Sequence, residues 1–131
     1  MSAFLKIKKR KDFVRAAKIG EKVITTSAIL QAAQSLSTEP VAAKFGFTTT
    51  KKIGKAHIRN RARRRMRAVV REFAGEARDN TEYVLIGRHN TADCDFDTLR
   101  RDIRYGINRL NKLLYDQKND EILEETAHLE H

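Results

Sequence analysis

The apolar positions between residues 56 and 73 recur every three or four residues and predict one long amphipathic helix. These positions are Ile58, Ala62, Met66, Val69, Val70 and Phe73. At about 1.5 Å per residue, the helix would be about 27 Å long. Its apolar stripe covers roughly a third of the circumference, so one side packs on a core and the other side is polar.

Two further helices are predicted near the ends of the chain. Residues 8–19 suit a short helix that ends at Gly20. Its expected core positions are Phe13, Ala16 and Ala17. Asp95 is a suitable N-cap for a last helix that ends near Tyr115. That helix would pack through Leu99, Ile103, Ile107, Leu110 and Leu114.

Three strands are expected between these helices. Residues 23–33 are rich in β-branched and small apolar residues, and residues 42–49 predict a second strand. The connection over residues 34–40 holds the only proline, and the two strands are antiparallel if it is a hairpin. Residues 50–55 predict a loop. The nearly continuous apolar run of residues 82–88 is typical of a strand that is buried on both faces.

The predicted order of elements is helix, strand, strand, helix, strand, helix. This order makes a single α+β domain over residues 1–116. Residues 117–131 are expected to form an acidic flexible tail. Within that tail, residues 129–131 resemble the start of a purification-tag linker.

The charge of the chain is unevenly distributed along its 131 residues, for a formal net charge of +10. Residues 1–39 carry eight basic and three acidic side chains. Residues 40–71 carry eleven basic side chains and no acidic one, whereas residues 72–131 carry eight basic and fourteen acidic side chains. A face this positive is typical of a protein that binds nucleic acid. An anionic membrane would also attract it, but no predicted helix has a strongly apolar face to insert. We therefore expect a nucleic-acid partner and no membrane.

The sequence contains no evident catalytic or metal-binding constellation. The histidines at positions 57, 89 and 128 are far apart, and none has metal-ligand spacing to another. No glycine-rich phosphate loop occurs. Cys94 is the only cysteine, which excludes an intrachain disulfide and fits a reducing cytoplasm. We therefore expect no catalytic residue and no metal site in this chain.

Six arginines lie between residues 59 and 67, on the predicted long helix. Neighbouring like charges on a helix repel each other, so a face that is merely solvated is the weaker explanation. Each guanidinium stays charged and can pair with two phosphate oxygens. Asn60 adds a donor and an acceptor that can address a base edge or a 2′-hydroxyl group. This pattern predicts a helix that lies against nucleic-acid phosphates.

One longer motif narrows the partner. From Phe45 to Arg67 the chain reads Phe-Gly-Phe-Thr-Thr-Thr-Lys-Lys-Ile-Gly-Lys-Ala-His-Ile-Arg-Asn-Arg-Ala-Arg-Arg-Arg-Met-Arg. It resembles the protein subunit of bacterial ribonuclease P, whose signature couples a strand, a Lys-Lys-x-Gly loop and a helix opening with Arg-Asn-Arg. The similarity extends in outline from Lys6 to Tyr115.

The resemblance implies a two-layer α/β sandwich, similar to the second domain of ribosomal protein S5. Its mixed sheet would contain a left-handed βαβ crossover, although right-handed crossovers are the general rule. The resemblance also implies that an RNA subunit hydrolyses precursor transfer RNA with Mg²⁺ ions that this RNA mainly binds. One protein would join one such RNA, and it would also hold the 5′ leader of the substrate.

The resemblance also assigns roles to individual residues. Those facing the catalytic RNA would be Lys51, Lys52, Arg59, Asn60, Arg61, Arg63, Arg64 and Arg67. Those in a leader-binding cleft between the first helix and the sheet would be Phe13, Lys9, Gln31 and Lys44. Relatives often have aromatic residues at the positions of Ala17 and Gln31. Without these aromatics, leader binding would depend less on base stacking and more on charge.

Two other functions stay open at this point. A ribosomal protein or a general RNA chaperone would use the same basic helix and would have no role in cleavage. A protein that is itself a nuclease is disfavoured because the sequence has no metal or acid–base constellation.

Overall fold

Five strands form one mixed sheet in the order β1-β4-β5-β3-β2 within the computed structural model, which describes residues 4–116. The strands are β1 Leu5–Lys6, β2 Glu21–Ile24, β3 Ala28–Gln34, β4 Lys44–Thr48 and β5 Thr81–Gly87. The helices are α1 Arg10–Ile19, α2 Ala56–Phe73 and α3 Phe96–Asn111, followed by a π-helical turn over Lys112–Asp116. The predicted tail and the tag-like residues 129–131 lie outside the described residues.

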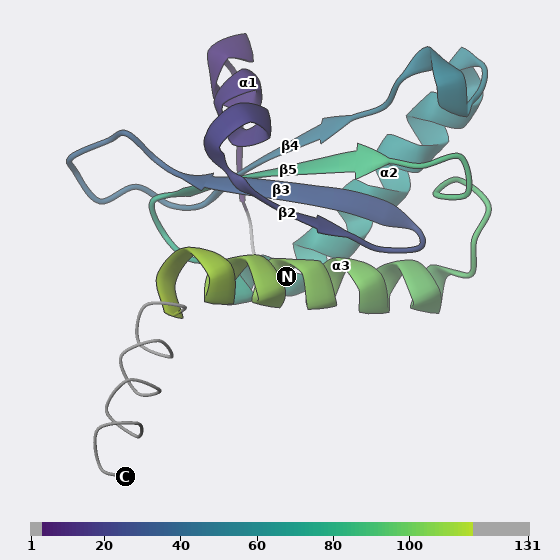
Figure 1. The fold of residues 1–131 in the computed structure, drawn as a ribbon. Helices are drawn as coiled ribbons and strands as arrows, with labels where there is room; N and C mark the ends of the chain where they lie inside the picture. Colours follow the sequence, from purple (N-terminus) through teal and green to yellow (C-terminus); the bar gives the residue numbers. More distant parts are fainter. Residues whose placement is uncertain (1–3, 117–131) are drawn as a thin grey trace, which may run out of the picture.

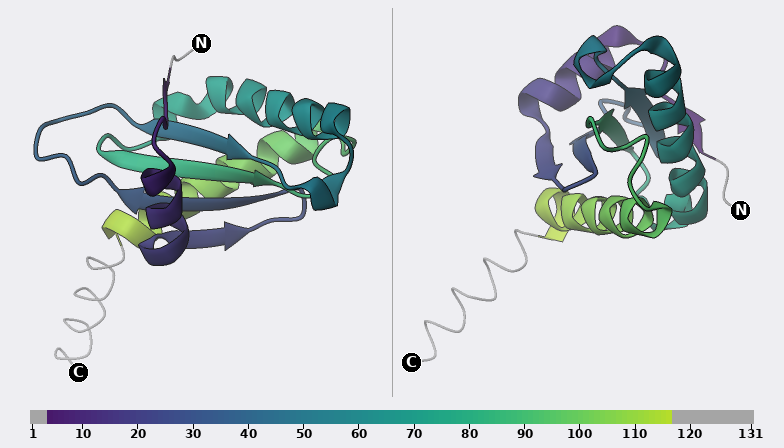
Figure 2. Two further views of the ribbon diagram at one scale, coloured as in Figure 1. Left: turned by 90° about the horizontal axis from the view of Figure 1, so that it is seen from above. Right: turned by 90° about the vertical axis from the view of Figure 1, so that its right-hand side faces the viewer.

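The three helices cover the two faces of the sheet unequally. Helices α2 and α3 pack side by side on one face, and α1 stands over one end of the other (Figures 1 and 2). The parallel strands β4 and β5 are neighbours, and α2 connects them behind the sheet by a left-handed crossover (Figure 1). The predicted fold class, including this crossover, is confirmed.

The apolar stripes predicted for α2 and α3 form the larger core. Met66, Val69 and Val70 of α2 are completely buried, as are the predicted α3 positions Leu99, Ile103, Ile107 and Leu110. Ile58 and Phe73, at the two ends of the α2 stripe, are half-buried. Burial of this stripe fixes the rotation of α2 about its axis, so the arginines between the stripe residues face outward.

The strand predicted over residues 23–33 is two strands. Thr25, Thr26 and Ser27 make a turn, in which the Thr25 hydroxyl donates to the carbonyl of Ala28 at 2.6 Å, and β2 pairs antiparallel with β3. Hydroxyl side chains favour such turns because they bond to nearby backbone groups. The buried Asp102 of α3 accepts bonds from the Ser27 amide and hydroxyl, so the turn is anchored to the core.

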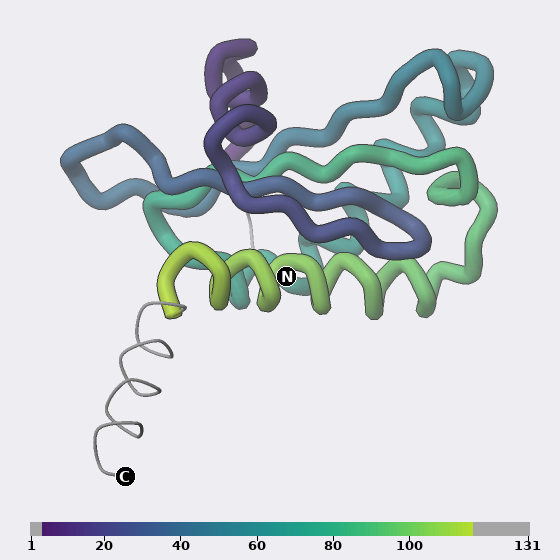
Figure 3. The backbone as a smooth tube through the Cα atoms, viewed as in Figure 1, coloured from purple at the N-terminus to yellow at the C-terminus, as the bar shows by residue number. Residues whose placement is uncertain are grey.

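The second predicted strand does not pair with the first. Strand β5 lies between β3 and β4, so β4 is parallel to β5 and to the short, unpredicted β1. The connection over residues 35–43 extends beyond the end of the sheet (Figure 3) instead of forming a hairpin. The backbone of Asn80 holds this connection in place. Its N–H donates to the carbonyl of Val41, and its carbonyl accepts from the N–H of Ser35, both at 2.7 Å. The burial of β5 on both faces was predicted correctly, and it requires this central place.

Two smaller predictions were wrong in part. Ala17 is exposed, whereas Ala16 is buried and Phe13 is half-buried, as expected of α1. Asp95 precedes the first residue of α3, but its side chain makes no capping hydrogen bond. The last helix therefore depends on its buried face for stability rather than on this cap.

Candidate nucleic-acid interface

The outer face of α2 carries positive charge that no carboxylate within residues 4–116 neutralises. Asn60, Arg61, Arg64 and Arg71 are exposed. Within residues 4–116, no arginine between positions 59 and 71 forms an ion pair with a carboxylate. Within the described part of the chain, repulsion among these groups is therefore uncompensated, and an anion that neutralised them would be favoured.

Three arginines of α2 also have partners within the protein. Arg63 donates to the Thr49 hydroxyl at 2.6 Å and to the Asn60 side chain. Arg65 donates to the backbone carbonyls of Thr91, at 2.6 Å, and of Cys94. Arg67 lies 5.5 Å above the ring of Phe47. These contacts hold the three side chains in fixed directions.

The remaining arginine of the predicted set, Arg59, is half-buried, and its Nε atom has no partner among residues 4–116. The same is true of the Nε atom of Arg67. The six predicted α2 residues thus differ in environment. Asn60, Arg61 and Arg64 are exposed, whereas Arg59, Arg63 and Arg67 are half-buried.

The start of α2 adds to this positive surface. The predicted loop contains a single 3₁₀ turn, Lys51–Ile53, whose two lysines are exposed. Gly54 joins it to the helix with a φ of 144°, and a Cβ atom there would lie 3.0 Å from Ile58, so glycine is required. The first turn of α2 holds no acidic residue, which leaves the positive end of the helix dipole free to attract phosphate.

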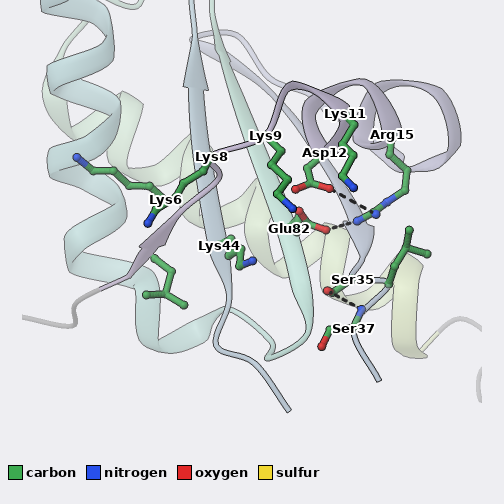
Figure 4. A pocket seen from close by; sticks show the side chains of 12 residues that line it. Lys6, Lys8, Lys9, Lys11, Asp12, Arg15, Ser35, Ser37, Lys44 and Glu82 are labelled. Atoms are coloured by element: carbon green, nitrogen blue, oxygen red, sulfur yellow. Dashed lines mark hydrogen bonds and ion pairs between the residues drawn. The ribbon is translucent and has the colours of Figure 1, made fainter. Parts of the chain in front are cut away.

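The four residues predicted for the leader cleft fall into two groups. Lys9 and Lys44 line a groove of about 410 Å³ beside the N-terminal turn of α1 (Figure 4). Phe13 and Gln31 do not line it. Phe13 packs over Gly46, where a Cβ atom would come within 2.4 Å of its ring, and it belongs to the smaller core under α1.

Gln31 lies on the same face of the sheet as α1, next to a row of aliphatic residues. Ile24, Ile29 and Ile86 are cross-strand neighbours, and Thr48 continues the row onto β4. Ile24 is 62% exposed, and Ile29, Ile86 and Gln31 are half-buried. The part of the sheet that α1 leaves uncovered is thus aliphatic, and it runs from strand β2 toward the start of α2.

Sequence reasoning missed most of the groove that contains Lys9 and Lys44. Its lining also includes Lys6, Lys8, Lys11, Asp12, Arg15 and Glu82. The run of basic residues from Lys6 to Lys11 was the available signal. Strand pairing then brings Lys44 and Glu82 together, since these two residues are partners in the parallel register of β4 and β5.

Other kinds of site are not found in the described part of the chain. Residues 4–116 hold no group of three histidine, cysteine or carboxylate side chains placed to bind a metal ion. Among the same residues, no helix is both long and apolar enough to cross a membrane.

The fold and this surface define a small basic α+β protein with an arginine-rich helix on its surface. The Ribonuclease P family model matches residues 1–111, and the chain belongs to the family of ribonuclease P protein components. It is 39% identical to the ribonuclease P protein component of Paramagnetospirillum magneticum, over 82% of this chain and 84% of that protein. It is 42% identical to the ribonuclease P protein component of Gluconacetobacter diazotrophicus, over 76% of this chain and 84% of that protein.

Solved structures agree on the fold. The ribonuclease P protein of Staphylococcus aureus matches with a TM-score of 0.66 at 22% identity, covering 85% of this chain and 97% of that one. The protein from Thermotoga maritima also gives a TM-score of 0.66 at 22% identity, with coverages of 82% and 96%.

Proposed function

We propose that this protein is the RNA-binding subunit of a cytoplasmic ribonuclease P holoenzyme, which removes the 5′ leader from precursor transfer RNA. The observation that carries the proposal is the arginine face of α2, which no carboxylate neutralises within residues 4–116. In the holoenzyme the catalytic RNA supplies the missing negative charge. One protein joins one RNA.

In this proposal the residues of α2 have two duties. Arg61 and Arg64 are exposed and unpaired among the described residues, and they bind phosphates of the catalytic RNA together with Lys51 and Lys52. Arg59, Asn60, Arg63 and Arg67 bind beside them, but their fixed or half-buried side chains select the path of the RNA backbone. Several guanidinium forks at fixed spacing distinguish one folded RNA from others by shape.

The hydrolytic chemistry belongs to the RNA in this proposal. In this proposal the RNA phosphates hold most of the Mg²⁺ ions. When bound by the RNA, magnesium would supply Lewis-acid activation of the attacking water and of the leaving oxygen. The protein contributes by neutralising RNA charge and by holding the substrate.

The 5′ leader lies across the uncovered face of the sheet in this proposal. The row formed by Ile24, Ile29 and Ile86 offers an apolar floor to the bases, and Gln31 adds an amide beside it. Phe13 is half-buried and packs on Gly46, so only part of its ring is available to the leader. Leader affinity therefore depends on charge more than on stacking.

Reconstitution at low magnesium concentration tests this function. Precursor transfer RNA is incubated with the catalytic RNA alone, with the protein alone, and with both. We expect no cleavage by the protein, slow cleavage by the RNA and strong stimulation by the pair. Cleavage by the protein alone would make it a nuclease. An absence of stimulation would instead favour a ribosomal or chaperone-type RNA-binding protein.

A further inference from the structure

Thr49 follows the last residue of β4, and the two branches of its side chain make separate contacts. Its hydroxyl oxygen accepts a hydrogen bond from the Arg63 guanidinium at 2.6 Å. Its methyl group lies over Gly87 of β5, where a Cβ atom would come within 2.9 Å of it, so the glycine makes room for the methyl. Because Thr49 is β-branched, these two contacts fix its rotamer, with the methyl on the sheet and the hydroxyl toward α2.

Arg63 transmits this constraint to Asn60. One terminal nitrogen of Arg63 donates to Thr49, and the other donates to the side-chain oxygen of Asn60, about one turn earlier on α2. The guanidinium group is planar and rigid, so fixing one of its nitrogens on Thr49 sets the direction of the other. The hydrogen-bonded chain from Thr49 through Arg63 to Asn60 therefore connects the sheet to the exposed face of α2.

The orientation of the Asn60 amide follows from the chemistry of its partner. A guanidinium group only donates hydrogen bonds, so the Asn60 atom that faces Arg63 is its carbonyl oxygen. The NH₂ group then points away from Arg63. Asn60 is exposed, and its NH₂ group makes no hydrogen bond within residues 4–116. Asn60 therefore presents N–H donors to a ligand.

The fold itself gains little from this chain of hydrogen bonds. Thr49 and Arg63 are half-buried and Asn60 is exposed, so water could replace each of these contacts at small cost. The chain does, however, hold a long and a short polar side chain in fixed directions before any ligand arrives. Side chains that are already ordered lose less entropy on binding, so the arrangement favours recognition more than stability.

We infer that Thr49 is a positioning residue for RNA binding, which acts through Arg63 to present the Asn60 NH₂ group to a phosphate oxygen of the catalytic RNA. The inference rests on the proposed function, in which Arg61 and Arg64 bind phosphates beside Asn60. A phosphate oxygen is an acceptor only, as this NH₂ group requires. Thr49 acts from the sheet and does not itself contact the RNA.

The two branches of Thr49 allow its packing and its positioning role to be separated. Thr49→Val keeps a methyl group on Gly87 and removes the hydroxyl, whereas Thr49→Ser keeps the hydroxyl and removes the methyl. Thr50→Val is the matched control, because Thr50 is exposed, has an extended backbone and makes no capping hydrogen bond. Affinity for the catalytic RNA is measured by titration, and stability is measured by urea unfolding.

We expect Thr49→Val to weaken binding of the catalytic RNA about tenfold, the effect of one hydrogen bond, while its stability stays close to that of the wild type. Thr49→Ser should bind as the wild type does, although it loses packing and is the less stable of the two. Thr50→Val should change neither property. In an Arg63→Ala background, Thr49→Val should cause no further loss, because the two residues act as one unit.

The role of Asn60 as a donor has its own test. Asn60→Asp keeps an acceptor for Arg63 and has no N–H group. Its affinity is compared with that of the wild type at about 1 M salt, where the Debye length is about 3 Å and long-range charge effects are screened. We expect a loss of about tenfold. An unchanged affinity would show that Asn60 does not bind as a donor, and it would overturn this part of the inference.

The positioning role of Thr49 would be overturned by any of three results. These are wild-type affinity in Thr49→Val, weakened binding in Thr49→Ser, and a further loss from Thr49→Val when Arg63 is already replaced. Failure of the proposed function looks different from all three, because the wild-type protein itself would then not stimulate cleavage by the catalytic RNA.

Discussion

Arg64 and Arg65 are adjacent on α2, yet the structure predicts opposite effects when each is replaced. Arg64 is exposed and has no partner within residues 4–116. Arg65 is half-buried, donates to the carbonyls of Thr91 and Cys94, and lies 5.6 Å from the ring of Phe96. It therefore fastens α2 to the loop between β5 and α3. The pair makes a matched test of binding against folding.

The loss of stability for Arg65→Ala can be worked out from these contacts. A hydrogen bond from a charged donor contributes about 1.5 kcal/mol at the low end of its range, which is appropriate for a half-buried group. Two such bonds contribute about 3 kcal/mol, and the contact with Phe96 adds roughly 0.5 kcal/mol. The higher helix propensity of alanine offsets only a few tenths of a kcal/mol. We expect Arg65→Ala to lower the free energy of unfolding by about 3 kcal/mol.

Urea unfolding followed by circular dichroism measures this change, with Arg64→Ala as the control. Arg64→Ala should leave the free energy of unfolding within about 0.5 kcal/mol of wild type, as for most surface substitutions. It should instead lower the salt slope of RNA binding by roughly 0.7–0.9, the effect of one phosphate contact. Equal stability of the two variants, or a larger loss for Arg64→Ala, would refute the assignment of Arg65 to the fold.

Three further predictions concern stability. Burial raises the pKa of Tyr83 to about 12, against about 10 when unfolded, so stability that is complete below pH 10 is lost as the pH rises toward 12. The free energy of unfolding should fall by about 2–3 kcal/mol over this pH range. Tyr83→Phe should not show this fall, and identical curves of stability against pH for the variant and the wild type would contradict the prediction. Arg15→Leu should cost about 3–5 kcal/mol because Glu82, which forms an ion pair with Arg15, stays buried without a partner. The double variant Arg15→Leu/Glu82→Leu should recover most of the lost stability, as measured by thermal unfolding. A double variant less stable than Arg15→Leu would refute the role of the unpaired Glu82. Gly54→Ala should cost about 1–3 kcal/mol through its strained backbone, and an unchanged urea midpoint would disprove that strain.

The features that were predictable from the sequence are those that local patterns determine. Ala62, Met66 and Val70 repeat at helical spacing and are all buried, so α2 and its outward arginines could be placed before the structure was seen. The run from Glu82 to Arg88 likewise predicted a strand buried on both faces, because such a strand is apolar at successive positions.

The features that were missed depend on contacts between distant segments. Arg64 and Arg65 look alike in sequence, because the carbonyls that bind Arg65 belong to residues 91 and 94. The lysine groove was only partly predicted, because Lys44 reaches it through the pairing of β4 with β5. Strand order is also non-local, and the hairpin turn at residues 25–27 was hidden by the apolar residues on both sides.

The proposed role of the α2 arginines is to hold the catalytic RNA, with no part in cutting. It is tested most directly by titrating wild-type protein and Arg61→Ala/Arg64→Ala into catalytic RNA and precursor at low magnesium concentration. Circular dichroism first confirms that the variant is folded, since both side chains are exposed.

If two charge-assisted contacts contribute about 1.5 kcal/mol each, the variant needs roughly 100-fold more protein for half-maximal stimulation. At saturation it should reach the wild-type cleavage rate. A lower maximal rate at saturating protein would show that these arginines act in the cleavage step, and it would contradict the account.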